Sequence, residues 1–374
     1  MKRYLLSILL LLATAAAPQA WADTPADSVL GTLIKVNRYF MDRHPDPTLP
    51  TNVGKLRPSN LWTRGVYYEG LMALYGIHPD QAYINYTDRW ATAHQWQPRN
   101  GVNTCDADDQ CCEQTYLERY MQSGGDEKIR FVKQNLQHQM GTKVGWWTWV
   151  DAIQMGMPVY AMMYRITGDA QYMEHAMKMY RFSRDTVAGG LYNKVQHLWW
   201  RDADFVPPYK EADGANCYWS RGNGWVYAAL VRCMSQLKPG SKYYKQLRAD
   251  VVAMSKALLQ CQRSDALWNV SLLSPATFGG KELSGSALFL YGMSWSLNHG
   301  VIKGKAYREC CDRTWQALVR DCIHRDGFLG YVQGTGKQPA DAQPVTYTRV
   351  PDFDDFGTGC LLLGGSEYYK LVKS

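Results

Sequence analysis

Two acidic positions have the residue type and the surroundings for acid–base chemistry. Asp151 follows the tryptophan-rich segment 146–150. Indole rings around a carboxyl group partly remove it from water, which disfavours the ionised form and makes the group a usable general acid. Asp108 and Asp109 form a second acidic position, ahead of the helix-like run 115–120. If one of them faces Asp151, mutual repulsion leaves one carboxyl group protonated and the other ionised at neutral pH.

The segment 217–225 has the composition of a binding surface for a sugar acid. Trp219 and Trp225 supply indole faces that pack on sugar CH groups, and Arg221 between them offers paired donors to a carboxylate. Glycines in the segment let the backbone approach a ligand closely. The alternative is structural, because large aromatic residues are mostly buried. The acidic positions have an equivalent alternative, since aspartate near a helix start is often a cap.

Other kinds of site have little support in the sequence. His197 lies in the run before the aromatic segment, where a lone histidine is usually a surface residue. Cys105, Cys111 and Cys112 are close enough together to suggest a local disulfide, and the ten cysteines fit an oxidising compartment. The chain has no paired Cys-x-x-Cys motif, phosphate-binding loop, nucleophile elbow or zinc-protease motif. We therefore expect no metal and no other cofactor.

Residues 1–22 have the pattern of a secretory signal peptide, with a basic start, an apolar core and a small-x-small end before Asp23. The apolar core is shorter than the roughly 20 residues that a spanning helix needs, so we expect no membrane anchor. The mature protein is expected in the periplasm or outside the cell. Its net charge falls from +7 to +5 without Lys2 and Arg3, which suits a small acidic substrate better than nucleic acid. No obligate protein partner is indicated.

A helix, a tight turn and a second helix recur along the chain, and strand signals are sparse. The turns fall at 73–83, 123–126, 164–172, 238–241 and 301–305. Longer irregular stretches lie between successive hairpins, at 99–106, 193–216, 272–281 and 334–355. Short turns at one end and long loops at the other are typical of a closed toroid of inner and outer helices. An open solenoid is the alternative, but its repeats are more uniform in length. We predict a single all-α domain over residues 23–374.

Four segments resemble one known family, and they occur in order over nearly the whole mature chain. Residues 149–160, with 167–169, are similar to the catalytic-acid helix of glycoside hydrolase family 105, the unsaturated rhamnogalacturonyl hydrolases. Residues 218–225 resemble the family's Trp-x-Arg-Gly-Asn-Gly-Trp motif. Residues 282–287 and 355–367 resemble a helix start and the C-terminal signature of the same family.

The resemblance implies an (α/α)6 barrel and an unusual reaction. Members of the family hydrate the C4=C5 double bond of a terminal unsaturated uronic acid that a polysaccharide lyase has left behind. By resemblance, Asp151 would protonate C4, and Asp151 or a neighbouring acid would then assist attack of water at C5. The second acid falls on Asp108, with Asp109 as the competing choice. The predicted substrate contacts are Trp147, Trp149, Trp219, Arg221, Trp225 and His197.

The chain departs from the family pattern after Gly190-Leu191, where an aromatic-histidine pair is usual and this chain delays histidine to His197. Either His197 reaches the site from an altered loop, or Trp199, Arg201 and Asp202 contact the sugar instead. The leading substrate is a short unsaturated galacturonyl-rhamnose oligosaccharide from pectin. The alternatives are an unsaturated glucuronyl hydrolase, a noncatalytic glycan-binding toroid and, less favoured because no histidine pair is present, a sugar epimerase.

Overall fold

The computed structural model describes residues 25–52, 56–349 and 355–374, so the predicted signal peptide lies outside the described residues. Helices dominate this part of the chain. The paired strands within it are very short, β1 (Thr51–Asn52) and β2 (Leu56–Arg57), which agrees with the sparse strand signals. None of the helices described is long and apolar enough to cross a membrane.

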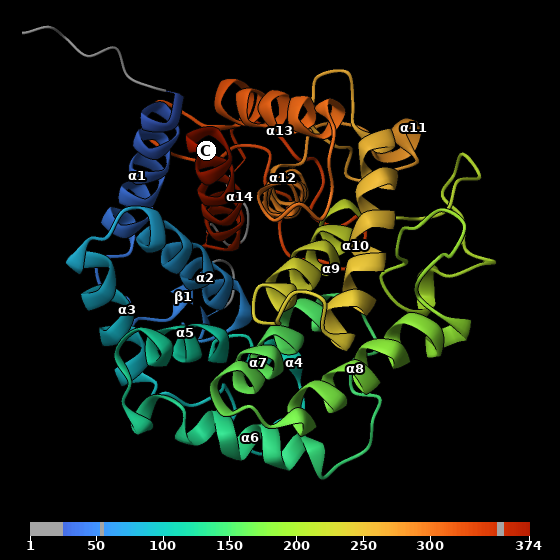
Figure 1. Ribbon diagram of the computed structural model, residues 1–374. Helices are drawn as coiled ribbons and strands as arrows, with labels where there is room; N and C mark the ends of the chain where they lie inside the picture. The colour runs from blue at the N-terminus through green and yellow to red at the C-terminus, as the bar shows by residue number, and fades with distance from the viewer. Residues whose placement is uncertain (1–24, 53–55, 350–354) are drawn as a thin grey trace, which may run out of the picture.

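The long helices form two concentric rings (Figure 1). In the inner ring each helix packs against the next, and the last packs against the first, so the ring is closed. The inner helices are α2 (Trp62–Ile77), α5 (Glu113–Ser123), α7 (Asp151–Thr167), α9 (Ser220–Met234), α12 (Leu283–Asn298) and α14 (Asp355–Lys373). The outer helices are α1 (Pro25–Arg43), α3 (Gln81–Ala93), α6 (Arg130–Met140), α8 (Ala170–Asp185), α10 (Lys242–Cys261) and α13 (Lys305–Ala317).

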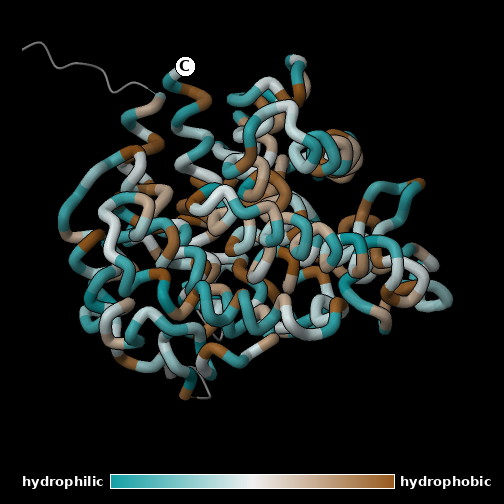
Figure 2. The backbone as a smooth tube through the Cα atoms, turned by 60° about the horizontal axis from the view of Figure 1, so that its bottom comes forward, coloured by the Kyte–Doolittle hydropathy of each residue, from teal (hydrophilic) through white to brown (hydrophobic). Residues whose placement is uncertain are grey.

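The two rings differ in how much of each helix is buried. Outer helix α10 buries one stripe at helical spacing, formed by Tyr244, Leu247, Val251, Met254 and Leu258. Hydrophilic and hydrophobic residues accordingly alternate along the peripheral coils of the chain (Figure 2). Inner helix α9 is buried at every residue, because it is covered by the outer ring on one side and by its inner neighbours on the other.

Glycines allow the closest contact within the inner ring, between α2 and α14. A Cβ atom added to Gly70 would lie 2.5 Å from the carbonyl oxygen of Gly359, and one added to Gly359 would lie 2.2 Å from that of Val66. Both distances are far below van der Waals contact, so the two helix backbones approach as they do only because these positions lack side chains.

All six inner helices start at the same end of the barrel, because an outer helix returns the chain between successive inner ones. The turns from inner to outer helices are short, and aspartates cap two of the helices that follow, α3 and α8. Asp80 accepts a hydrogen bond from Ala82 N, and Asp169 accepts one from Gln171 N. The connections from outer to inner helices are long, and they contain the one-turn helices α4 (Ala107–Gln110) and α11 (Pro275–Phe278). The long loops therefore surround the starts of the inner helices.

The predicted (α/α)6 barrel is confirmed, and closure of the inner ring excludes the open solenoid. The prediction of a local disulfide is wrong, since all ten cysteines are free thiols. The Sγ atom of Cys111 lies 3.4 Å from Glu69 Oε1, and the Cys112 sulfur faces the carbonyl oxygens of Gln97 and Asp109. These two thiols are buried at separate contacts between elements, whereas Cys105 lies near Thr142.

Candidate active site

Asp151 is the first residue of α7 and lies at the long-loop end of the barrel. Its Oδ2 accepts a hydrogen bond from Arg201 Nε at 3.1 Å, which forms an ion pair. The guanidinium also donates through Nη1 to Asp202 at 2.7 Å. Backbone contact holds the same loop against α7, because Val150 N donates to the carbonyl of Arg201 at 2.9 Å. The side chains of Asp151 and Arg201 are 10% and 20% exposed, so both remain accessible to a small ligand.

Asp108 lies in the one-turn helix α4, which packs against α7. Burial raises the pKa of the Asp108 carboxyl to about 7, and the negative charges of Asp106 and Asp151 add to this effect. Arg201 acts in the opposite direction on the same group. Within the described part of the chain, no residue donates a hydrogen bond to the Asp108 carboxyl. Asp108 therefore holds a proton near neutral pH, while Asp151 is ion-paired.

Asp109 has a different environment from its neighbour. Its carboxyl accepts hydrogen bonds from Arg99 Nη1 at 2.9 Å, Asn100 Nδ2 at 3.0 Å and Thr104 Oγ1 at 2.7 Å. The side chain is only 2% exposed. Asp109 thus fixes the loop before α4, whereas Asp108 is turned towards α7. Of the two alternatives, the geometry favours Asp108 as the partner of Asp151.

Arg221 does not offer its guanidinium to a ligand as the sequence predicted. The side chain is fully buried, and its two terminal nitrogens donate to the carbonyl oxygens of Gln333 at 2.6 Å and Gly334 at 2.7 Å. Its plane is enclosed by the rings of Trp219 and Phe356, whose centroids lie 4.5 and 5.0 Å from the Arg221 Cζ atom. The donors expected for a substrate carboxylate instead hold the loop that precedes α14.

The tryptophans of the predicted sugar platform are also largely structural. Trp219, Trp225 and Trp147 are each at most 1% exposed, and the Trp219 indole donates to Gln333 Oε1 at 2.8 Å. Their ring faces are covered by protein, which supports the buried-anchor alternative. Trp149 is only partly buried and lies 6.0 Å below the Arg201 Cζ atom. Trp62, at the start of α2, is likewise partly exposed, and no motif in the sequence pointed to it.

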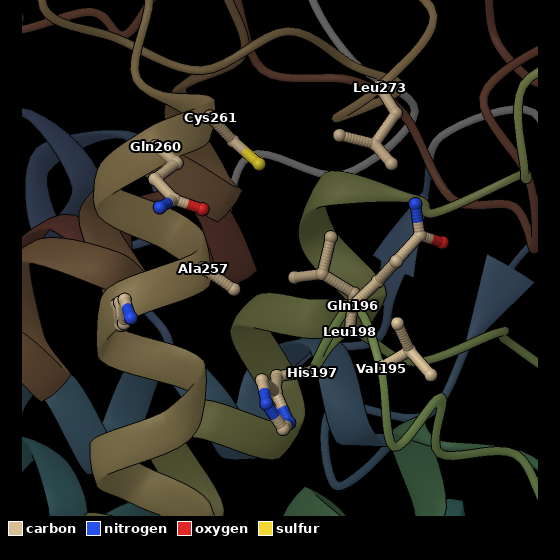
Figure 3. Close-up of a pocket in the computed structure, with 9 residues that line it drawn as sticks. Val195, Gln196, His197, Leu198, Ala257, Gln260, Cys261 and Leu273 are labelled. Carbon is tan, nitrogen blue, oxygen red and sulfur yellow. The ribbon is translucent and has the colours of Figure 1, made fainter.

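His197 lies away from the two acids. It lines a cavity of about 410 Å³ between the loop before α9 and outer helix α10, with Ala257, Gln260 and Cys261 on the opposite wall (Figure 3). Its Nδ1 lies 2.9 Å from the hydroxyl of Tyr192. The structure therefore does not bring His197 together with Asp108 and Asp151. The alternative was that Trp199, Arg201 and Asp202 contact the sugar instead. It fits in part, since Arg201 and Asp202 lie at Asp151 whereas Trp199 is buried in the core.

A buried polar network, which no motif predicted, lies deeper in the barrel. Arg232 donates to Gln114 and to Glu118, at 2.6 and 2.8 Å, and its Nε lies 3.6 Å from Glu69 Oε2. Glu69 also accepts from Gln154 Nε2 at 2.8 Å, one turn along α7 from Asp151. Burial raises the pKa of Glu69 to about 7, and Arg232 opposes that rise. Across the described ranges, no group of three or more His, Cys, Asp or Glu side chains is arranged to hold a metal ion.

Comparison with known proteins agrees with this architecture. The model of glycosyl hydrolase family 88 matches residues 32–372, nearly the whole described chain. The chain belongs to this family. This family 88 protein is 29% identical over 337 residues to an unsaturated 3S-rhamnoglycuronyl hydrolase of Formosa agariphila. The alignment covers 83% of this chain and 85% of the relative.

Solved structures agree with the family assignment. A family 88 glycosyl hydrolase from Bacteroides vulgatus is 29% identical with a TM-score of 0.84, covering 92% of this chain and 99% of that one. A possible family 105 member from Salmonella enterica, at 18% identity and a TM-score of 0.73, covers 95% of this chain and 96% of its own and shares the fold. The predicted relationship to the unsaturated uronyl hydrolases is confirmed by the family 88 match and by the relative from Formosa agariphila, the family 105 structure shares the fold, and the protein is a glycosyl hydrolase.

Proposed function

We propose that this protein removes a terminal 4,5-unsaturated uronic acid from a lyase-generated oligosaccharide by hydrating its C4=C5 double bond. The observation that carries the proposal is the pairing of Asp108 and Asp151 at the long-loop end of the barrel. One carboxyl group has a pKa raised to about 7, and the other is ion-paired with Arg201. A pair that holds one proton at neutral pH supplies both an acid and a base.

The chemistry needs both forms of that pair. A carboxylic acid gives its proton to C4 of the enol ether, and positive charge develops at C5, where the ring oxygen stabilises it. The carboxylate then removes a proton from water as the water oxygen bonds to C5. The resulting hemiketal opens and releases the neighbouring sugar, and the pair again holds one proton. We assign these proton transfers to the two carboxyl groups jointly, because closely coupled carboxyl groups titrate together.

We infer that the leaving sugar is rhamnose. The sequence resembles the rhamnogalacturonyl hydrolases, and the Formosa agariphila relative is named for a rhamnose-containing substrate. Unsaturated galacturonyl-rhamnose from rhamnogalacturonan remains our leading substrate. A sulfated unsaturated rhamnoglycuronyl oligosaccharide is the second candidate, and the name of that relative favours it. C4 stereochemistry is lost on elimination, so the sugar after the scissile bond decides between them. We place this reaction in the periplasm or outside the cell.

Loss of the double bond's absorbance in the near ultraviolet tests the proposal directly. The wild-type protein should consume unsaturated uronyl-rhamnose, with or without a sulfate on rhamnose, and the preferred form identifies the parent polysaccharide. Asp108→Asn and Asp151→Asn should each lower kcat by at least about 100-fold, the usual range for a lost acid or base. Asp109→Asn, which alters only the loop contacts, is the matched control and should retain most of the activity. The proposal fails if the wild type consumes no unsaturated disaccharide, or if both variants remain fully active.

A further inference from the structure

Arg201 is the exposed arginine at the acid pair, and only part of its guanidinium is engaged. Nε donates to Asp151 and Nη1 to Asp202, at 3.1 and 2.7 Å. Among the residues that the structure describes, none accepts a hydrogen bond from Nη2. The side chain is 20% exposed, whereas that of Arg221 is fully buried and bonded to backbone carbonyls. The donor that faces a ligand at this end of the barrel is therefore on Arg201.

A uronic acid brings a carboxylate next to the C5 atom that reacts. A guanidinium binds such a group best through two parallel N–H donors. Arg201 has one uncommitted nitrogen, and its second donor towards a ligand would have to come from the side now bonded to Asp151 or Asp202. Asp202 precedes a short helical turn and also accepts a bond from Asp204 N at 2.9 Å, which holds it in place. Asp151 is the partner whose interaction can weaken.

The charges around Arg201 determine what happens when a substrate carboxylate competes with Asp151 and Asp202 for its donors. Arg201 carries one positive charge and already contacts two carboxylates, so a third carboxylate is unfavourable unless one negative charge is removed. A carboxyl group that loses its guanidinium partner and gains a neighbouring anion binds a proton more readily. The charged groups that act on Arg201 or on its partners are Asp108, Asp151, Asp202, Asp204 and Lys337.

Lys337 does not replace Arg201 in this role. Its Nζ is paired with Asp204 at 2.8 Å, and the two side chains are 46% and 67% exposed. An exposed pair of this kind contributes little charge at the buried acids. Among the described residues Arg201 pairs with Asp151 and Asp202 and not with Asp108, so displacing its guanidinium removes no partner from Asp108. Asp151 is the group next to Arg201 that can take up a proton.

We propose that Arg201 binds the carboxylate of the unsaturated uronic acid and that Asp151, displaced as its partner, takes up a proton from solvent. Substrate binding thereby converts Asp151 into the acid that protonates C4. The proton taken up on binding passes to C4, Asp151 then takes a proton from the attacking water, and that proton returns to solvent when the product leaves and Arg201 pairs with Asp151 again. This inference rests on the proposed function, and it assigns to Arg201 the carboxylate contact that the sequence assigned to Arg221.

The test compares unsaturated uronyl-rhamnose with its uronamide, which has the same shape and no negative charge. The wild type should prefer the acid, with kcat/KM about 10- to 100-fold above that of the amide, the range for a charge-assisted pair of hydrogen bonds. Arg201→Gln should remove that preference by lowering kcat/KM for the acid alone. Arg201→Lys should restore part of it, because the charge returns without the planar fork. For the wild type, KM for the acid should rise between pH 6 and 8, whereas KM for the amide should stay constant.

Arg184→Gln is the matched control, because Arg184 on α8 is equally exposed at 21% and is also paired with two aspartates, Asp185 and Asp250. It should leave the acid-to-amide preference unchanged, and circular dichroism should show that all variants are folded. If Arg201→Gln retains the wild-type preference, or if KM for the acid is independent of pH, the inference is overturned while the proposed function stands. If the wild type turns over neither compound, the proposed function fails and takes the inference with it.

Discussion

Replacement of Asp108 by asparagine should stabilise the protein, and the gain should grow with pH. The folded-state pKa of Asp108 is about 7, compared with an ordinary value of 3.8. Because the folded-state pKa is the higher one, the stability contributed by this group is complete below about pH 4. It is lost as pH rises towards 7, since Asp108 ionises freely in the unfolded chain but not in its partly buried folded site. Asparagine has nearly the same shape and never ionises, so the variant avoids that loss.

The expected magnitude follows from the two pKa values. At about 1.4 kcal/mol for each unit of pKa, the raised pKa of Asp108 costs the folded protein about 4 kcal/mol of stability at pH 8 and about 1.5 kcal/mol at pH 5. The free energy of unfolding of Asp108→Asn, relative to wild type, should therefore increase by about 2.5 kcal/mol between these two pH values. The same substitution should abolish most of the activity, so this position exchanges stability for function.

Urea unfolding followed by circular dichroism measures the free energy of unfolding of wild type and Asp108→Asn at pH 5 and at pH 8. The comparison holds if the dependence on urea concentration is the same for both proteins. Asp109→Asn is the control at the adjacent position. It removes a charge that Arg99, Asn100 and Thr104 satisfy, so it should cost about 1–3 kcal/mol at pH 8 instead of raising stability. A gain for Asp108→Asn that is the same at both pH values, or a loss at pH 8, would refute the reasoning.

Two further predictions concern packing and buried charge. Arg232→Met should lower the free energy of unfolding by about 3–5 kcal/mol, because it leaves Glu69 and Glu118 without their cation inside the barrel. A loss below about 1 kcal/mol in urea unfolding would show that these two ion pairs are not needed. Gly156→Ala should cost about 1–3 kcal/mol, since its Cβ would lie 2.7 Å from Trp147 Cζ2. Gly76→Ala, where a Cβ meets nothing within 4 Å, should show no such loss in the same measurement.

The fold was predictable because its information is local. Each hairpin has apolar residues at helical spacing, a short turn and a capping residue such as Asp169, and these are properties of neighbouring residues. The closed ring then follows from repetition, since each outer helix brings the chain back to the same end. Asp151 was predicted as a candidate acid for a similar reason, because a tryptophan-rich segment precedes it directly in the sequence.

The site details were less predictable because they depend on contacts between distant loops. The partners of Arg221 are backbone carbonyls of residues 333 and 334, and carbonyl groups leave no trace in a sequence pattern. The choice between Asp108 and Asp109 depends on which side of a single helical turn faces α7. His197 was misplaced because the direction of its loop, which turns towards outer helix α10, is set by packing and not by residue type.

The burial of Arg221 changes what the segment 219–225 can tell us about other chains. Its side chains join the start of α9 to the loop before α14 and none of its donors reaches outward, so selection for a folded rim alone would preserve it. A relative that had lost all chemistry could still carry the segment intact. Whether such a chain is a working enzyme would be decided instead by three side chains from separate stretches of sequence, Asp108, Asp151 and Arg201.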